Sequence, residues 1–224
     1  IAKLLEKYNL YCIYDADVFF TSYDDTDPLI PLKVDSFSKR TIFLFTMTKE
    51  LGSPGLRISW GIGPKKLIQK LKNFQKISLE ILPPPNKFLV EKILKNVNVE
   101  RVKKILKERM EILVKGIKKL GWKIEKPSFG VNLFIPVPLN FKKLKRTNPD
   151  SVFSYYLAKK TKILVRTGSS HGNKKYDTVR FVISQKKEII KEAIERMKKE
   201  NISYNMYLPK EIEEEFINEI ITCK

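Results

Sequence analysis

Hydrophobic positions along the chain form two kinds of pattern, short continuous apolar runs and longer runs with helical spacing. Apolar runs of strand length occupy residues 10–16, 41–47 and 56–63, whereas helical spacing occupies 2–9 and a run that begins at Pro64. Continuous apolar strands are typical of parallel sheets that are covered on both faces. The first part of the chain therefore predicts an α/β domain built on a mostly parallel sheet.

The second part of the chain follows a different pattern. The segment "LPPPNKF" (82–88) predicts a break, and a long amphipathic helix follows over about 97–120. The remaining predicted elements are a strand, turn and strand over 122–138, a helix from Pro149, strands over 162–168 and 178–184, and a helix over 186–200. This order predicts a smaller α+β domain.

These patterns divide the chain into three parts. We predict that residues 1–95 belong to the large α/β domain, that 96–204 form the small domain, and that 205–224 form an appended acidic helix. The first residue, Ile1, already lies inside a helical pattern, so we expect the chain to be part of a longer polypeptide.

Composition restricts the class of protein. With 224 residues and 42% hydrophobic residues the chain can bury a sizeable core. No apolar run is long enough to cross a bilayer, and no signal peptide opens the sequence. The two cysteines, Cys12 and Cys223, lie near opposite ends, a pattern typical of reduced proteins. We therefore expect a cytoplasmic protein that has no membrane partner.

The net charge of +19 raises the alternative of a nucleic-acid-binding protein. The lysines are spread along helix faces, as in "ERVKKILKERMEILVKGIKKLG", where they alternate with an apolar stripe. No zinc-ligand spacing, helix-turn-helix pattern or RNA-binding aromatic strand accompanies them. The sequence therefore favours solvated helix faces over a nucleic-acid site, and it predicts no metal site.

A group of chemically suited residues lies at the ends of the first strands. Asp15 ends one predicted strand and Lys49 follows the next, and ligands of open α/β sheets bind outside the carboxyl ends of the strands. Thr46 and Thr48 add hydroxyl groups, and Arg57 adds a planar cation suited to phosphate. An acid, an amine that could form a Schiff base and a phosphate-binding arginine together describe a site for pyridoxal phosphate.

The stretch "TMTKELGSPGLRISWGIG" (46–63) resembles the lysine motif of class I/II aminotransferases, which are pyridoxal-phosphate enzymes of fold type I. The stretch "YCIYDADVFFTSY" (11–23) resembles the strand of this family that ends in aspartate. The resemblance implies that Lys49 carries the cofactor as a Schiff base, with Asp15 at the pyridine nitrogen. Asp17 is the alternative, because either aspartate of "DAD" can be aligned with the aspartate of the family.

The small domain carries further resemblance to this family. "VRFVIS" (179–184) resembles the late strand whose arginine binds the substrate α-carboxylate, which implies that role for Arg180. Arg166 is the alternative, and the spacing to the chain end favours Arg180. "KILVRTGSSHG" (162–172) and "KPSFGVNLFIPV" (126–137) resemble other small-domain segments, and His171 is interpreted as a turn residue. The resemblance covers nearly all of the chain except the final acidic helix.

The sequence also departs from the family pattern. A tyrosine is usual at the position of Val18, and Tyr14 or Tyr23 are the candidates to replace it. The N-terminal half of the family is absent, so the chain would hold the second half of the large domain and the C-terminal small domain. Such a fragment has an incomplete site when it is alone.

The function implied is an aminotransferase that moves an amino group between an amino acid and a 2-oxo acid, as a homodimer when complete. Alternatives on the same fold are a decarboxylase, a lyase, the sensor domain of a transcriptional regulator, or an inactive fragment. A basic binding module without catalysis is the alternative from a different class.

Overall fold

The structure is a computed structural model that describes residues 1–17, 21–24, 30–49, 53–78 and 84–222. The chain divides into two compact units. Unit 1 comprises Ile1–Ile105 and Ser128–Gly130, and unit 2 comprises Leu106–Pro127 and Val131–Lys224. This division lies inside the long helix, whereas the boundary that the sequence suggests lies before that helix.

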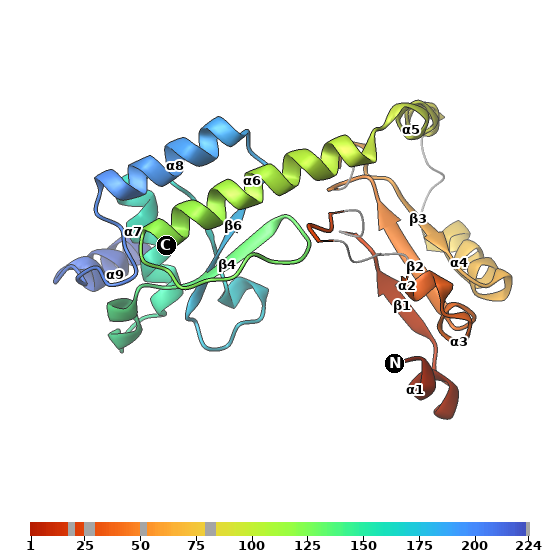
Figure 1. The fold of residues 1–224 in the computed structure, drawn as a ribbon. Helices are drawn as coiled ribbons and strands as arrows, with labels where there is room; N and C mark the ends of the chain where they lie inside the picture. The colour runs from red at the N-terminus through yellow and green to blue at the C-terminus, as the bar shows by residue number, and fades with distance from the viewer. Residues whose placement is uncertain (18–20, 25–29, 50–52, 79–83, 223–224) are drawn as a thin grey trace. The chain divides into compact units, whose positions relative to one another are not determined.

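Unit 1 is built around a small mixed sheet with the strand order β1-β2-β3 (Figure 1). Its elements are α1 (Ala2–Lys7), β1 (Cys12–Asp15), α2 (Ile30–Lys33), α3 (Asp35–Ser38), β2 (Thr41–Thr46), η1 (Pro54–Leu56), β3 (Ser59–Ile62), α4 (Lys65–Ser78) and α5 (Pro84–Asn96). Strands β1 and β2 are parallel, but β3 runs antiparallel to β2. Phe43 and Phe45 of β2 pack with Leu5, Ala16 and Phe37 in the core.

The segment 82–88 differs from its prediction. Residues 79–83 lie outside the described part of the chain, but α5 begins at Pro84, so the predicted break is wrong from that residue onward. Proline is tolerated in the first turn of a helix because the amide hydrogen it lacks would have no intrahelical acceptor there. The prolines in this segment therefore mark the start of a helix.

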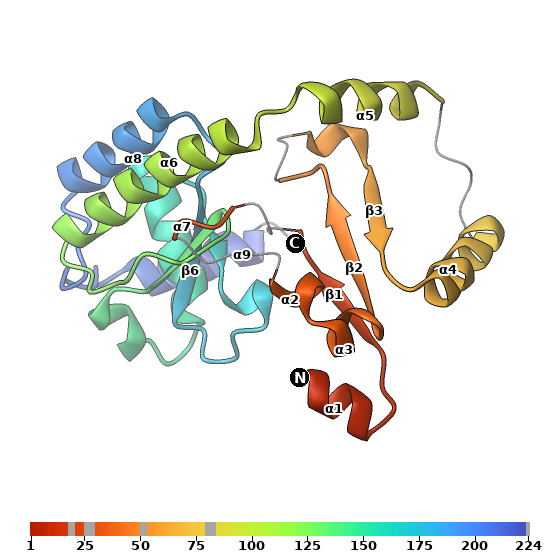
Figure 2. The ribbon, with the colours of Figure 1, turned by 45° about the vertical axis from the view of Figure 1, so that its right-hand side comes forward.

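Unit 2 is an antiparallel sheet, in the order β4-β6-β5, packed with helices. Its elements are β4 (Asn132–Pro136), η2 (Leu139–Lys143), α7 (Pro149–Thr161), β5 (Arg166–Thr167), η3 (Ser169–His171), β6 (Thr178–Val182), α8 (Lys187–Lys199) and α9 (Ile212–Thr222), together with most of α6 (Val99–Lys119). Helices α6 and α8 lie side by side in both views of the ribbon (Figures 1 and 2).

Helix α6 forms where the apolar stripe predicts it. The Asn98 side chain accepts a hydrogen bond from the Arg101 amide (2.9 Å) and so caps the first turn. The side chains buried along α6 recur at helical spacing: Leu106, Met110, Leu113, Val114 and Ile117. The lysines of this helix therefore lie on its remaining faces, as the sequence indicates.

Of two strands predicted for unit 2, one does not form and the other is shorter than the sequence suggests. Residues 122–127 form no strand, and the buried Trp122 instead donates a hydrogen bond to the Pro136 carbonyl (2.7 Å). The strand expected over 162–168 pairs with β6 only at Arg166 and Thr167. Apolar side chains can be buried without backbone pairing to a neighbouring strand. Strand propensity alone therefore predicts more strand residues than the structure contains.

The C-terminal acidic helix α9 packs within unit 2. Its Phe216 ring lies 5.6 Å from the Tyr155 ring of α7, and its Glu215 pairs with Lys159 (2.6 Å). Within the described residues, no helix is long and apolar enough to cross a membrane.

Candidate active site

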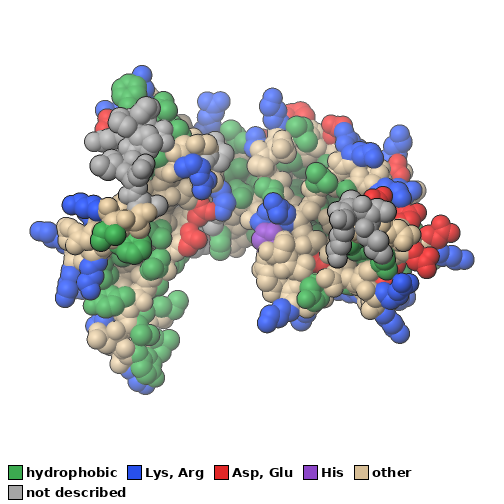
Figure 3. Space-filling model, turned by 180° about the vertical axis from the view of Figure 1, so that it is seen from behind, with side chains coloured by type: hydrophobic (Ala, Val, Ile, Leu, Met, Phe, Trp, Pro, Cys, Tyr) green, Lys and Arg blue, Asp and Glu red, His purple; other side chains and the backbone are tan. Residues whose placement is uncertain are grey.

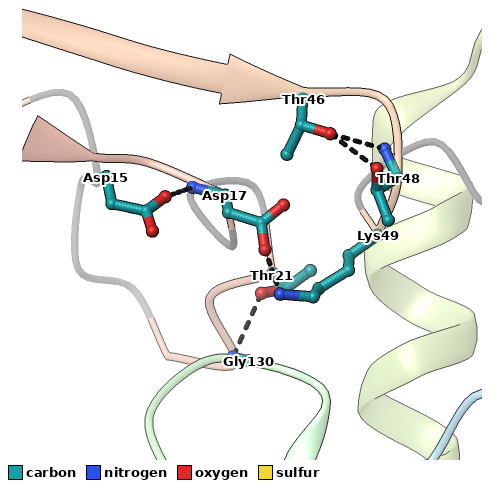
Figure 4. Close-up of polar contacts among 7 residues, drawn as sticks. All are labelled: Asp15, Asp17, Thr21, Thr46, Thr48, Lys49 and Gly130. Atoms are coloured by element: carbon teal, nitrogen blue, oxygen red, sulfur yellow. Dashed lines mark hydrogen bonds and ion pairs between the residues drawn. The ribbon is translucent and has the colours of Figure 1, made fainter. Parts of the chain in front are cut away.

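The predicted acid and lysine lie at one edge of the unit 1 sheet. Asp15 is the last residue of β1 and is opposite Leu44 in parallel β2. Lys49 follows the end of β2 by three residues (Figure 4). Because β1 and β2 are parallel, their carboxyl ends meet at the same edge, where α/β proteins bind ligands.

The side chain in contact with Lys49 is Asp17. Its Oδ2 forms an ion pair with the Lys49 Nζ, and the lysine side chain is 40% exposed (Figure 4). Asp17 Oδ1 is buried and has no hydrogen-bond partner among the described residues. Asp15 is exposed, and its Oδ1 accepts a hydrogen bond from the Asp17 amide (3.1 Å). The contact between Asp17 and Lys49 was not predicted, although the "DAD" spacing was its visible signal.

The two threonines fix the backbone that leads to Lys49. The Thr46 hydroxyl donates to the Thr48 hydroxyl (2.7 Å) and accepts from the Thr48 amide (3.0 Å). Such a hydroxyl-to-backbone bond mimics a turn and restrains the chain as it leaves the strand. Both side chains are half-buried. They therefore order the segment on which the lysine stands.

Arg57 follows η1 in a left-handed backbone conformation, with φ of 52°. This region is disfavoured for residues with a Cβ, so the surrounding bonds must hold it. The Met47 amide donates to the Ile58 carbonyl (3.1 Å), which fastens the turn to the end of β2. Arg57 is exposed in the same unit as Lys49, and its predicted phosphate contact stays a prediction.

The candidates to replace the missing tyrosine have structural contacts. Val18 itself lies outside the described residues. The buried Tyr23 hydroxyl donates to the Gly130 carbonyl, and burial raises the pKa of the Tyr23 phenol well above its usual range. Tyr14 packs against Phe43 with ring centroids 5.3 Å apart. Neither phenol makes a contact with Lys49 in the described structure.

The predicted carboxylate-binding arginine lies in unit 2. Arg180 is half-buried on β6, opposite Phe134 of β4 on one side and Arg166 of β5 on the other. Its Nε is buried and has no partner among the described residues. The two arginines between which the sequence had to choose are therefore cross-strand neighbours, a relation that sequence reasoning missed.

The turn after β5 is held by close backbone packing. A Cβ on Gly168 would lie 2.0 Å from the Thr178 Oγ1, so only glycine fits there. The buried Asp150 accepts a hydrogen bond from the Ser169 amide (2.9 Å). His171 ends η3 and its ring lies edge-on to Phe134 at 6.0 Å. These contacts fit the interpretation of His171 as a turn residue.

Charge is dispersed over the described surface. On the face shown in Figure 3, Lys and Arg side chains are spread over both units, and acidic side chains lie among them in both. No group of histidine, cysteine or carboxylate side chains in the described part of the chain has the geometry of a metal site.

A family model for aminotransferase class I and II matches residues 1–197 of the chain. The chain therefore belongs to the class I and II aminotransferase family. The match ends at residue 197, inside α8, and the division of residues 205–224 from the small domain stays a prediction.

Individual relatives are distant. The chain is 23% identical over 211 residues to an LL-diaminopimelate aminotransferase of Halothermothrix orenii, covering 89% of this chain and 50% of the relative. It is 24% identical over 217 residues to the transaminase BacF of Bacillus subtilis, covering 91% and 50%. The structure of apo-BacF from Bacillus subtilis superposes with a TM-score of 0.76 at 22% identity, covering 92% of this chain and 51% of BacF.

These comparisons confirm the α/β aminotransferase fold. They also show that the chain spans about half the length of the relatives it matches. That this half is the C-terminal one stays a prediction, which rests on the lysine motif around Lys49 and on the arginine strand that follows it. The roles of individual site residues likewise stay predictions.

Proposed function

We propose that the protein to which this chain belongs is a pyridoxal-phosphate-dependent aminotransferase acting on an amino acid and a 2-oxo acid. The observation that carries the proposal is the placement of Lys49 after the carboxyl end of β2, beside parallel β1, where it forms an ion pair with Asp17. Membership of the family supports it. The likeness to the diaminopimelate enzymes at 23% identity does not fix the substrate of this chain.

The residues at this edge fit pyridoxal phosphate. The group needs an amine for covalent attachment, a carboxylate for its ring nitrogen and donors for its phosphate. Lys49 supplies the amine, and Thr46, Thr48 and Arg57 are the proposed polar contacts. Asp15 is the proposed partner of the ring nitrogen. Asp17 stays the alternative, because its Oδ1 has no hydrogen-bond partner among the described residues.

The chemistry that we propose for this chain is proton transfer by Lys49. Pyridoxal phosphate, when bound, supplies an electron sink that stabilises negative charge at the substrate α carbon. Lys49 would hold the group until an amino acid displaces it, and its free amine would then remove the α proton. The lone pair of the amine performs both tasks, and Lys49 is paired with Asp17 in the structure. The ion pair between Lys49 and Asp17 therefore has to open before reaction.

Arg180 is the proposed binding residue for the substrate α-carboxylate. Its guanidinium is planar and its Nε has no partner within the described part of the chain, which suits two parallel hydrogen bonds to a carboxylate. We also propose a cytoplasmic homodimer with a role in amino acid metabolism. The free Cys12 is consistent with a reducing compartment, and sedimentation of the full-length protein would test the dimer.

The decisive experiment traps the cofactor on its lysine. Borohydride treatment of the full-length protein with pyridoxal phosphate should fix the label on the peptide that contains residues 41–57. Lys49→Ala should abolish this label, whereas the matched control Lys39→Ala, in the same unit, should retain it. Label on another lysine would overturn the assignment. An aminotransferase would convert the donor amino acid to its 2-oxo acid and the acceptor 2-oxo acid to an amino acid. A decarboxylase would instead release carbon dioxide.

A further inference from the structure

Helix α7 and the C-terminal helix α9 enclose a small hollow on the surface of unit 2. Helix α9 lies beyond residue 197, where the match to the family model ends. The hollow has a volume of about 210 Å³. Sites for organic ligands usually measure about 300–1,000 Å³, so this one suits a small ion. Its polar lining consists of Tyr156, Lys159, Lys160, Lys210, Glu211 and Glu215.

Tyr156 supplies a hydrogen-bond donor to the hollow. The residue is 8% exposed, and its ring packs against that of Phe141 with centroids 5.8 Å apart. Within the described part of the chain, its hydroxyl makes no hydrogen bond. Burial, followed by the charge of Glu200, raises the pKa of this phenol, so the hydroxyl stays protonated near neutral pH. A largely buried donor without an acceptor costs free energy, which a ligand in the hollow would recover.

The lysines around the hollow outnumber the carboxylates that line it. Lys159 forms an ion pair with Glu215 (2.6 Å). Lys160 and Lys210 are exposed and have no ion pair with any described residue. The same holds for Glu211 among the described carboxylates. Two ammonium groups and one carboxylate therefore remain, and their net positive charge favours an anion.

The amino end of α9 adds further positive potential. The helix begins at Ile212, which also lines the hollow, and the first amides of a helix lack intrahelical acceptors. Acidic side chains in this first turn make other contacts. Glu213 accepts hydrogen bonds from the Arg146 amide (3.1 Å) and the Thr147 hydroxyl (2.7 Å). Glu214 forms an ion pair with Arg146 (3.9 Å), so the end of α9 can still attract an anion.

We propose that this hollow is a binding site for inorganic phosphate, which is bound by Tyr156, Lys160 and Lys210 and recognised by Glu211. Phosphate keeps a hydroxyl at neutral pH, and a carboxylate can accept a hydrogen bond from it. Sulfate has no such hydroxyl. A phosphate monoester loses its last acidic proton at a pKa of about 6, so it would also meet Glu211 without a hydrogen to donate. Glu211 therefore selects free phosphate over sulfate and over phosphorylated metabolites.

The test is a calorimetric titration of the full-length protein with inorganic phosphate, in the presence of pyridoxal phosphate so that the proposed cofactor site is filled. We expect phosphate to bind at least about tenfold more tightly than sulfate, because sulfate opposes one acceptor with another. Lys210→Gln should weaken phosphate binding about tenfold through the loss of a charge-assisted hydrogen bond. Tyr156→Phe keeps the packing of the ring and should weaken binding about 2–10-fold. Glu211→Gln should remove most of the preference over sulfate.

The matched controls are Tyr155→Phe on α7 and Lys162→Gln at its C-cap, neither of which lines the hollow. Both should bind phosphate as wild type does. Equal affinities for phosphate and sulfate would overturn the inference. So would a phosphate affinity that is unchanged in both Tyr156→Phe and Lys210→Gln, or tighter binding of glycerol phosphate than of free phosphate. None of these results touches the proposed function, because the borohydride label on Lys49 is measured separately.

Discussion

The two units bury their apolar residues to very different degrees. Among the described residues, unit 1 has eight buried hydrophobic side chains and 17 large ones that are exposed, whereas unit 2 has 22 buried and eight exposed. Amphipathic α4 shows the contrast most clearly, because none of its side chains is buried and Phe74 and Ile77 are 67% and 88% exposed. Unit 2 is thus stabilised by its own core, while unit 1 presents apolar surface suited to further packing.

The proposed reactive residues and the larger hydrophobic core therefore lie in different units. The proposed lysine and carboxylates lie in unit 1, which buries few side chains, and the proposed carboxylate-binding Arg180 lies half-buried on the sheet of the well-packed unit 2. Substitutions at the unit 1 edge should therefore change reactivity with little effect on folding. Core substitutions should destabilise unit 2 much more than equivalent changes on α4.

The largest effect is expected at the two carboxylates of unit 1. Asp15→Asn should reduce transamination by about 10²–10⁴-fold while cofactor stays bound, because the ring nitrogen loses the acid that keeps it protonated. Asp17→Asn should have the smaller effect, since Asp17 is already paired with Lys49. Single-turnover rates with a saturating amino acid would measure both. If Asp17→Asn abolishes activity and Asp15→Asn does not, then Asp17 and not Asp15 is the partner of the pyridine nitrogen.

The second prediction compares the cores directly. Phe153 is fully buried in unit 2, with its ring 5.2 Å from Phe141, and Phe153→Ala should cost about 3–5 kcal/mol of unfolding free energy. The same change at the exposed Phe74 of unit 1 should stay within about 0.5 kcal/mol. Urea unfolding of the 224-residue chain, in which Phe74 is exposed, would measure both.

A large loss at Phe74 in this chain would break the comparison, because it would mean that the Phe74 side chain is buried in solution. A small loss at Phe153 would show that the unit 2 core is poorly ordered in solution.

Several elements of both units could be predicted from the sequence, and the predictions that failed did so for physical reasons. The stripe of α6 and the strand of Phe43 and Phe45 follow from periodicity, which reports burial. Helix α5 was missed because prolines were interpreted as a break. The pairing of Arg166 with Arg180 depends on strand register, which is set by turns and packing between distant segments. The family motif singled out Lys49 and Arg57, but only coordinates show that Asp17 contacts Lys49.

The third prediction concerns Arg180. Arg180→Lys keeps the charge but loses the fork that binds a carboxylate through two parallel hydrogen bonds, so we expect KM to rise about 10–100-fold for every amino acid. Borohydride labelling of Lys49 should be unchanged, because that residue lies in unit 1. Arg146→Lys, at an exposed arginine of unit 2, is the control. An unchanged KM in Arg180→Lys would remove this residue from the substrate site.

The smallest effect is expected from a surface ion pair of unit 2. Lys187 Nζ lies 2.7 Å from Glu108 Oε1, and this hydrogen bond holds the pKa of the Glu108 carboxyl below its usual range. A carboxyl whose pKa is lower in the folded state contributes stability above its unfolded pKa and loses that contribution as pH falls through the folded pKa. The Tm difference between wild type and Glu108→Gln should therefore be present at about pH 7 and decrease as the pH falls below the ordinary glutamate pKa of about 4.3. Both side chains are about half exposed, so the difference should be small and should shrink in high salt.

Glu125→Gln, which removes an exposed acid of the same unit, is the control and should show no such pH-dependent difference. A Glu108→Gln protein whose Tm follows wild type across this range of pH would show that the pair contributes nothing in solution.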